Sequence, residues 1–118
     1  MIMSEGTLEI LENKVGDVCI LKIKGRLDAV STPQSEKTVF EYINNGNYKL
    51  LLDFSQVDYI SSAGMRMLLS STKKLKALSG KLILCQINAG VMDVLKMSGF
   101  DHVLELAKNE EEALRKFS

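Results

Sequence analysis

The stretch "DFSQVDYISSAGMRMLL", residues 53–69, joins an apolar, strand-like segment to a helix-like segment through two adjacent serines and a glycine. The segment "YKLLLDF" (residues 48–54) carries three consecutive leucines. It is therefore apolar on both faces and predicts a buried strand. After the serines, apolar residues recur at helical spacing as far as Ser79-Gly80, which predicts a helix. A buried strand leading into a helix is typical of an α/β domain.

The rest of the chain alternates in the same way. Strands are predicted at 7–12, 17–25, 81–87 and 102–106, with a hairpin turn at 13–16, and helices within 31–46, 88–100 and 109–117. Ser31 or Thr32 can cap the first helix, Pro33 suits its first turn, and Asn45-Gly46 can end it. The order β-β-α-β-α-β-α-β-α predicts one small α/β domain over residues 1–118, with a mixed, mostly parallel sheet and helices packed on it.

Composition excludes several classes of function. The 118 residues include 15 basic and 15 acidic ones, so no excess of positive charge favours nucleic acid. No apolar run reaches the roughly 18 residues of a membrane span, and the start resembles no signal peptide, so we expect a cytoplasmic protein without membrane insertion. Cys19 and Cys85 lie in apolar, strand-like runs, and we expect buried free thiols.

Catalytic chemistry is sparse. His102 is the only histidine, no Gly-rich phosphate loop occurs, and no His, Cys and carboxylate residues have metal-ligand spacing. Asp28, Asp53 and Asp58 lie near strand ends, but nothing pairs them as acid and base. We expect no enzyme, no cofactor and no metal.

The serine pair has two interpretations. A serine at a helix start accepts a bond from a backbone N–H that lacks a helical partner, which is worth about 1 kcal/mol. Gly64 permits close approach of backbone or of a partner. Alternatively, an exposed hydroxyl on a strand-end loop is reachable by a kinase, and phosphate would add about −1.5 to −2 charges there. Ser61 and Ser62 can each take either role.

Two motifs resemble the STAS domain family, specifically the bacterial anti-sigma factor antagonists. One is "LKIKGRLDAVSTP" and the other "LLLDFSQVDYISSAGMRMLL"; "KLILCQI" and "VLKMSGFD" are similar to later family segments. The resemblance covers nearly the whole chain and implies the STAS fold. It also implies that the unphosphorylated protein binds an anti-sigma factor that is a serine kinase, which releases the sigma factor. Phosphorylation ends this binding, and a serine phosphatase restores it.

The resemblance assigns the phosphorylated residue by position. It is the residue two before Gly64, which is Ser62. Ser61 stands where the family often has aspartate, and Ala63 where it often has Ser or Thr. Asp28 matches the acidic residue of the first motif, close to the phosphorylation site in the family fold.

Neighbouring residues carry open alternatives. Asp28 either contacts the partner or makes local backbone bonds, and Arg66 either pairs with phosphate or is a solvated arginine. Met67 either extends an exposed binding patch or packs in the core. Ser31 and Thr32 either line the same surface or only cap a helix. The expected partner-binding set is Asp28, Ser31, Thr32, Ser61, Ser62, Ala63, Gly64, Arg66 and Met67.

Two other functions remain open at this point. A STAS domain can serve as a scaffold, a sensory module or an accessory subunit of a transport system without acting on a sigma factor. A small nucleotide-binding protein or enzyme is the third hypothesis, and it requires nucleotide affinity at the strand ends.

Overall fold

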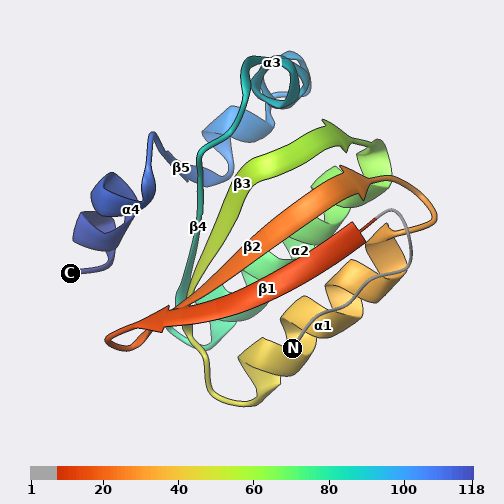
Figure 1. Cartoon of the computed structure of the whole chain (residues 1–118). Helices are drawn as coiled ribbons and strands as arrows, with labels where there is room; N and C mark the ends of the chain where they lie inside the picture. The colour runs from red at the N-terminus through yellow and green to blue at the C-terminus, as the bar shows by residue number, and fades with distance from the viewer. Residues whose placement is uncertain (1–7) are drawn as a thin grey trace.

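The architecture is a five-stranded sheet with helices on both faces. The structure is a computed structural model that describes residues 8–118. The sheet has the order β1-β2-β3-β4-β5; β1 runs antiparallel to β2, and the remaining neighbours are parallel (Figure 1). The elements are β1 Leu8–Val15, β2 Val18–Leu27, α1 Thr32–Asn44, β3 Lys49–Ile60, α2 Ser62–Ala77, β4 Lys81–Cys85, α3 Ala89–Met97, the 3₁₀ helix η1 Phe100–His102, β5 Glu105–Ala107 and α4 Glu110–Phe117. The predicted α/β class and element order are confirmed.

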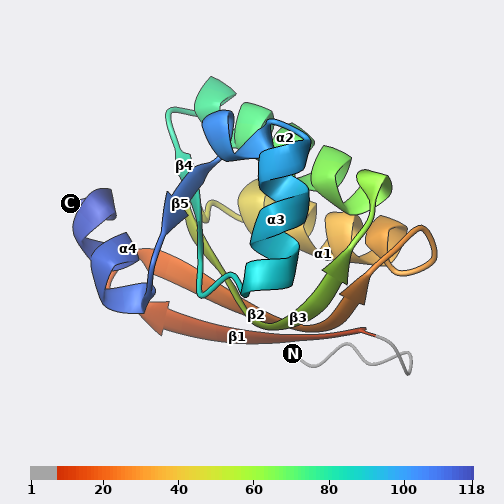
Figure 2. The same cartoon turned by 90° about the horizontal axis from the view of Figure 1, so that it is seen from above.

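Apolar side chains form one core on each face of the sheet. Helices α1, α2 and α3 pack on one face, and Figure 2 shows them together on the same side of the strands. Helix α4 covers part of the other face with Ala113 and Phe117. Leu50 and Leu52 point into the first core and Leu51 into the second, and all three are fully buried. The prediction that these leucines make a strand apolar on both faces is confirmed.

Strand β3 is longer than predicted. It continues past Phe54 to Ile60 instead of ending before an apolar linker. The added residues pair with the end of β2, from Lys24 opposite Gln56 to Leu27 opposite Ile60, with one shift of register before Lys24 and a second between Gly25 and Arg26. A pairing partner distant in sequence therefore extends the strand, and it carries β3 to the point where α2 begins.

Other strand boundaries differ from the prediction as well: β1 ends at Val15, β2 at Leu27 and β4 at Cys85. The hairpin turn is Gly16–Asp17 rather than 13–16, because Val15 and Val18 already pair across the strands and Gly16 takes a φ of 60°. The last strand begins at Glu105, and His102 ends η1 instead of opening a strand, since Val103 and Leu104 both donate backbone bonds to the carbonyl of Phe100. The predicted first strand includes residue 7, which lies outside the described residues.

Both cysteines are free and buried, as predicted. Burial raises the pKa of the Cys19 thiol to about 11 and that of Cys85 to about 12. Neither thiol is therefore a ready nucleophile near neutral pH. Among the described residues, no helix combines the length and the apolar character needed to cross a membrane.

Candidate functional site

The two motifs meet at one corner of the molecule. Strand β3 ends at Ile60 and α2 begins at Ser62, while the end of β2 lies alongside, with Leu27 paired to Ile60. The backbone N–H of Ser61 donates to the carbonyl oxygen of Leu27 at 2.8 Å. The loop that follows β2 is thus fastened beside the start of α2. We call this region the β3–α2 corner and define it as residues 60–64 with the neighbouring loop 28–31.

Ser61 is the cap of α2. Its backbone is extended, with φ −97° and ψ 175°, and its hydroxyl accepts from the N–H of Gly64 at 3.3 Å. Its carbonyl accepts the first helical bond, from Met65 at 3.0 Å. One of the unpaired N–H groups of the helix start is therefore satisfied without any help from Ser62.

Ser62 is the first residue of α2 and is exposed. Within the described part of the chain its hydroxyl has no hydrogen-bond partner. The two serines consequently differ in role: the first is used by the fold, and the second is left free at the surface. A phosphate on Ser62 would lie at a helix N-terminus, where the helix dipole favours negative charge.

Gly64 serves close packing within the chain. A Cβ at this position would lie 2.8 Å from Ile60 Cγ1 and 3.1 Å from both the Cβ and the carbonyl oxygen of Leu27. Of the two predicted uses, approach of the chain's own backbone is the one observed. Gly64 is buried, so the expectation that it contacts a partner is not supported by its position.

Met67 lies in the core, with 1% of its surface exposed. The alternative of an exposed binding patch is therefore wrong, and the alternative of a packed core methionine is correct. The reason is that α2 has two covered faces: besides the sheet it touches α1, where Ser70 donates to Glu36 at 2.9 Å. Helical spacing from a single apolar stripe does not reveal this second face.

Arg66 is exposed and lies one helical turn beyond Ser62. It makes no ion pair with a residue of the described chain. Ala63, which lies between these two residues in the sequence, is half-buried. The pairing of Arg66 with a phosphate stays a prediction that this geometry permits.

Asp28 makes local backbone bonds. Its Oδ1 accepts from the N–H of Val30 at 3.0 Å and of Ser31 at 2.9 Å, and Arg26 Nε lies 3.7 Å from its Oδ2. The bond from Ser31 holds the pKa of Asp28 below its ordinary value; partial desolvation opposes this, and Val30 and Arg26 reinforce it. Asp28 therefore stays ionised and orders the loop, whatever else it contacts.

Ser31 and Thr32 are both buried, so neither lines the outer surface as one alternative expected. Ser31 does hold the N-cap position of α1, as predicted, but its hydroxyl makes no cap hydrogen bond there. Ser31 Oγ donates to the carbonyl of Arg26 at 2.6 Å and accepts from the N–H of Asp28 at 3.1 Å, and Thr32 Oγ1 is buried without a partner among the described residues. The backbone carbonyl of Asp28 accepts from the N–H of Thr32 at 3.0 Å, while its carboxylate accepts from the N–H groups of Val30 and Ser31 just before the helix. Pro33 does occupy the first turn, as predicted.

Sequence reasoning missed a stacked pair beside the corner. The guanidinium of Arg26 lies 4.2 Å from the ring centroid of Tyr59, which remains 40% exposed. Both residues precede buried ones, Leu27 and Ile60, so the alternation along each strand places them together on the opposite face. This alternation was the available signal.

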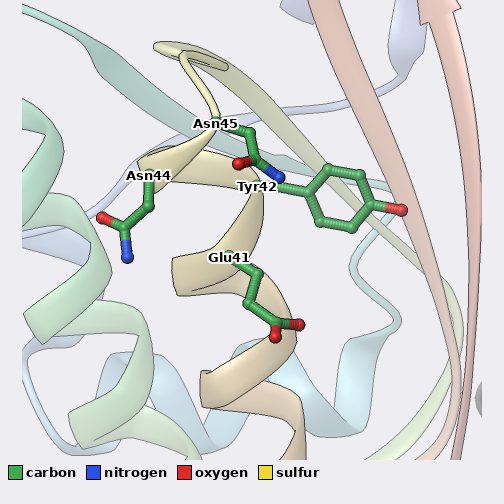
Figure 3. Close-up of a pocket in the computed structure, with 4 residues that line it drawn as sticks. All are labelled: Glu41, Tyr42, Asn44 and Asn45. Atoms are coloured by element: carbon green, nitrogen blue, oxygen red, sulfur yellow. The ribbon is translucent and has the colours of Figure 1, made fainter.

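Cavities on the described part of the chain lie away from the β3–α2 corner. One of about 390 Å³ lies at the end of α1, lined by Glu41, Tyr42, Asn44 and Asn45 (Figure 3). The Tyr42 hydroxyl donates to Glu12 at 2.9 Å, and burial, with that contact, raises the pKa of Tyr42 to about 12. Among the described residues, no three or more His, Cys, Asp or Glu side chains are grouped so that they could hold a metal ion.

These features define a small α/β binding domain with a free hydroxyl at a strand-to-helix corner. The chain belongs to the STAS domain family, whose model matches residues 10–113. BtrV of Bordetella bronchiseptica, provisionally named an anti-sigma factor antagonist, is 29% identical over 110 residues, which cover 93% of this chain and 95% of that protein.

Solved structures show the same fold. The crystal structure of TM1081 from Thermotoga maritima, also provisionally described as an anti-sigma factor antagonist, superposes with a TM-score of 0.84 at 25% identity, covering 92% of this chain and 93% of that one. The Bacillus cell fate determinant SpoIIAA in its phosphorylated form gives a TM-score of 0.69 at 22% identity, covering 92% of this chain and 99% of that one. The second likeness is one of fold alone.

Proposed function

We propose that this protein is an anti-sigma factor antagonist whose binding is switched off by phosphorylation of Ser62. The unphosphorylated form binds an anti-sigma factor that is also a serine kinase, which frees the sigma factor. A serine phosphatase acting on the phosphorylated form restores binding. The protein works by binding, with no catalytic step of its own. The names of BtrV and TM1081 support the class of partner.

The observation that carries the proposal is that the two serines have different roles, one as the cap of α2 and the other as an exposed hydroxyl. Ser61 already supplies the helix cap, at 3.3 Å from the N–H of Gly64. Ser62 is exposed and its hydroxyl is unbonded within the described chain, so its modification breaks no contact that the fold needs. The surface that a partner meets here comprises Ser62 and Arg66, with the half-buried Asp28, Ser61 and Ala63 around them.

The charge of a phosphate on Ser62 would disfavour the complex without disfavouring the folded protein. A phosphoserine carries about −1.5 to −2 charges at neutral pH. The start of α2 tolerates that charge, but a partner seated on Ser62 would have to bury or pair it. A penalty of about 3 kcal/mol weakens binding by roughly a hundredfold, which is enough to end the complex.

Affinity capture from a lysate of the source organism tests the proposal. The baits are the wild type, Ser62→Ala, Ser62→Asp and, as a matched control, Ser61→Ala, which removes the cap and keeps the acceptor. We expect a serine kinase with every bait except Ser62→Asp. Incubation of the captured kinase and ATP with wild type and Ser61→Ala should add one phosphate at Ser62, and none to Ser62→Ala. Capture of the same partner by all four baits, or of no kinase by any, would contradict the proposal and favour a scaffold.

A further inference from the structure

The most exposed apolar side chain near the corner is Val30, in the loop between β2 and α1. It is 86% exposed, whereas the next two residues, Ser31 and Thr32, are buried and each leaves only 6% of its surface exposed. A single exposed valine is common on protein surfaces and by itself needs no explanation. Its setting is what distinguishes Val30.

The loop that carries Val30 is held firmly. The N–H of Val30 itself donates to Asp28 Oδ1 at 3.0 Å, and Ser31 N–H donates to the same oxygen at 2.9 Å. Ser31 Oγ ties the loop back to the carbonyl of Arg26 at 2.6 Å. An apolar side chain presented on an ordered loop loses little conformational entropy when a partner covers it, so it contributes more to affinity than one on a mobile loop.

The stacked side chains of Arg26 and Tyr59, which we call the rim, adjoin this loop. Arg26 reaches Asp28 Oδ2 at 3.7 Å while stacking on Tyr59 at 4.2 Å, so one guanidinium connects the Val30 loop with the end of β3. Tyr and Arg are residue types enriched in protein interfaces, where they combine apolar surface with a polar group. The rim leads from Val30 to the residues just before Ser62.

The Val30 loop lies beside the start of α2, within reach of a partner that covers Ser62. The loop starts at Leu27, whose carbonyl accepts from Ser61 N–H at 2.8 Å. Val30 is three residues further, a reach of at most about 11 Å. A specific interface covers about 800 Å² on each partner, equivalent to a disc about 16 Å in radius. An interface of this size centred on the β3–α2 corner can therefore include Val30.

We infer that Val30 is the apolar contact by which the anti-sigma factor kinase docks on this protein, received by an apolar pocket on the kinase. The inference rests on the proposed function and adds a docking residue to it. Phosphate acts at Ser62, whereas Val30 supplies affinity before and during phosphorylation. Loss of one buried valine, with a charge in its place, should weaken the complex at least about tenfold.

Competition for the kinase tests this assignment. Immobilised Ser62→Ala protein captures the kinase from lysate, and soluble competitors displace it: Ser62→Ala alone, Ser62→Ala with Val30→Asp, and Ser62→Ala with Val103→Asp. Val103 is a matched control because it is a valine, 53% exposed, beside Gly80 and Lys81 at the start of β4, on the opposite edge of the sheet. Thermal melts verify that all three competitors are equally folded.

We expect Val30→Asp to require at least about tenfold more protein for half displacement, and Val103→Asp to match the parent within about twofold. Equal displacement by Val30→Asp and the parent would overturn the inference and leave the proposed function standing. Equal weakening by both valine variants would also overturn it. Capture of no kinase by the immobilised protein would contradict the proposed function and the inference together. A Val30-dependent partner that is not a kinase would overturn the kinase as occupant.

Discussion

Two strand-to-helix corners of the same sheet use their polar residues differently. At the β4–α3 corner, Asn88 caps α3 through Oδ1, which accepts from Val91 N–H at 2.9 Å, while its Nδ2 donates to the carbonyl of Val57 at 2.7 Å. The next two residues are Ala89 and Gly90, which bring no hydroxyl. At the β3–α2 corner, Ser61 provides the cap and Ser62 follows with a hydroxyl that the described chain does not bond.

The difference shows that one polar residue suffices to begin a helix in this fold. At the β4–α3 corner both polar atoms of the Asn88 side chain make hydrogen bonds within the fold. The second hydroxyl of the β3–α2 corner is surplus to folding, which is the condition for a side chain that can be modified without unfolding the protein. Substitutions at equivalent places in the two corners should therefore have unequal effects.

The largest expected difference concerns the glycine after each cap. In Gly64→Ala the new methyl would lie 2.8 Å from Ile60 Cγ1 and 3.1 Å from Leu27 O, and overpacking of this kind costs about 1–3 kcal/mol. In Gly90→Ala it would meet only Asn88 Oδ1, at 3.5 Å, and the gain in helix propensity should stabilise the protein by up to about 1 kcal/mol. Urea unfolding of both variants measures the change. Equal effects would show that the β3–α2 corner is not tightly packed.

The two caps come next in size. Asn88→Ala removes a cap and a bond to Val57, so we expect a loss of about 1–2 kcal/mol in the free energy of unfolding. Ser61→Ala removes one bond of 3.3 Å and should cost about 1 kcal/mol or less. Equilibrium urea unfolding is again the measurement. A larger loss of unfolding free energy for Ser61→Ala than for Asn88→Ala would mean that the serine cap contributes more to stability than the asparagine cap.

A pH dependence separates the corners further. The pKa of Asp28 is lowered in the folded state, chiefly by the bond from Ser31 N–H. Around the ordinary aspartate pKa of about 3.9 the unfolded state therefore binds more protons, and stability rises with pH. The contribution of Asp28 is present above that pH and is lost as the pH falls through the lower, folded-state pKa.

Thermal melts of the wild type and Asp28→Asn at pH 7 and pH 3 test this sign. The wild type should be the more stable at pH 7, by a modest margin because solvent screens this half-buried carboxylate, and the margin should shrink at pH 3. Asn88 does not titrate, so the difference between wild type and Asn88→Ala should change much less over the same range. A margin for Asp28→Asn that grows on acidification would reverse the argument.

Most of the fold was predictable because local signals agree. Glycine turns, helix caps and apolar spacing gave the element order, and the three leucines of β3 indicated burial on both faces. The boundaries that differed depend on backbone hydrogen bonds that apolar spacing does not reveal, one set distant in sequence and the other within a single turn. The extension of β3 to Ile60 needs the end of β2 beside it, and the late start of β5 follows from bonds to the carbonyl of Phe100.

The site was predictable in part for the same reason. The strand-to-helix junction indicated the serine pair, the family resemblance assigned Ser62 within it, and α2 does begin there. The spacing could not divide the two serines into a cap and a free hydroxyl, because that depends on backbone angles. It also could not decide whether Met67 is exposed or packed in the core, since α1 covers a face of α2 that no apolar period marks. The stacking of Arg26 on Tyr59 arises from the register of two strands.

The smallest expected effect tests the comparison most directly. Ser62→Ala should leave the free energy of unfolding within about 0.5 kcal/mol of the wild type, because the hydroxyl has no partner within the described chain. Ser62→Asp should be unchanged or slightly more stable, by about 0.3–1 kcal/mol, since it adds negative charge to the first turn of a helix that has no acidic residue there. Both are measured by urea unfolding beside the Ser61→Ala variant. A loss above about 1 kcal/mol in Ser62→Ala would show that folding needs the second hydroxyl, and the two corners would then no longer differ in the way on which the proposed switch at Ser62 rests.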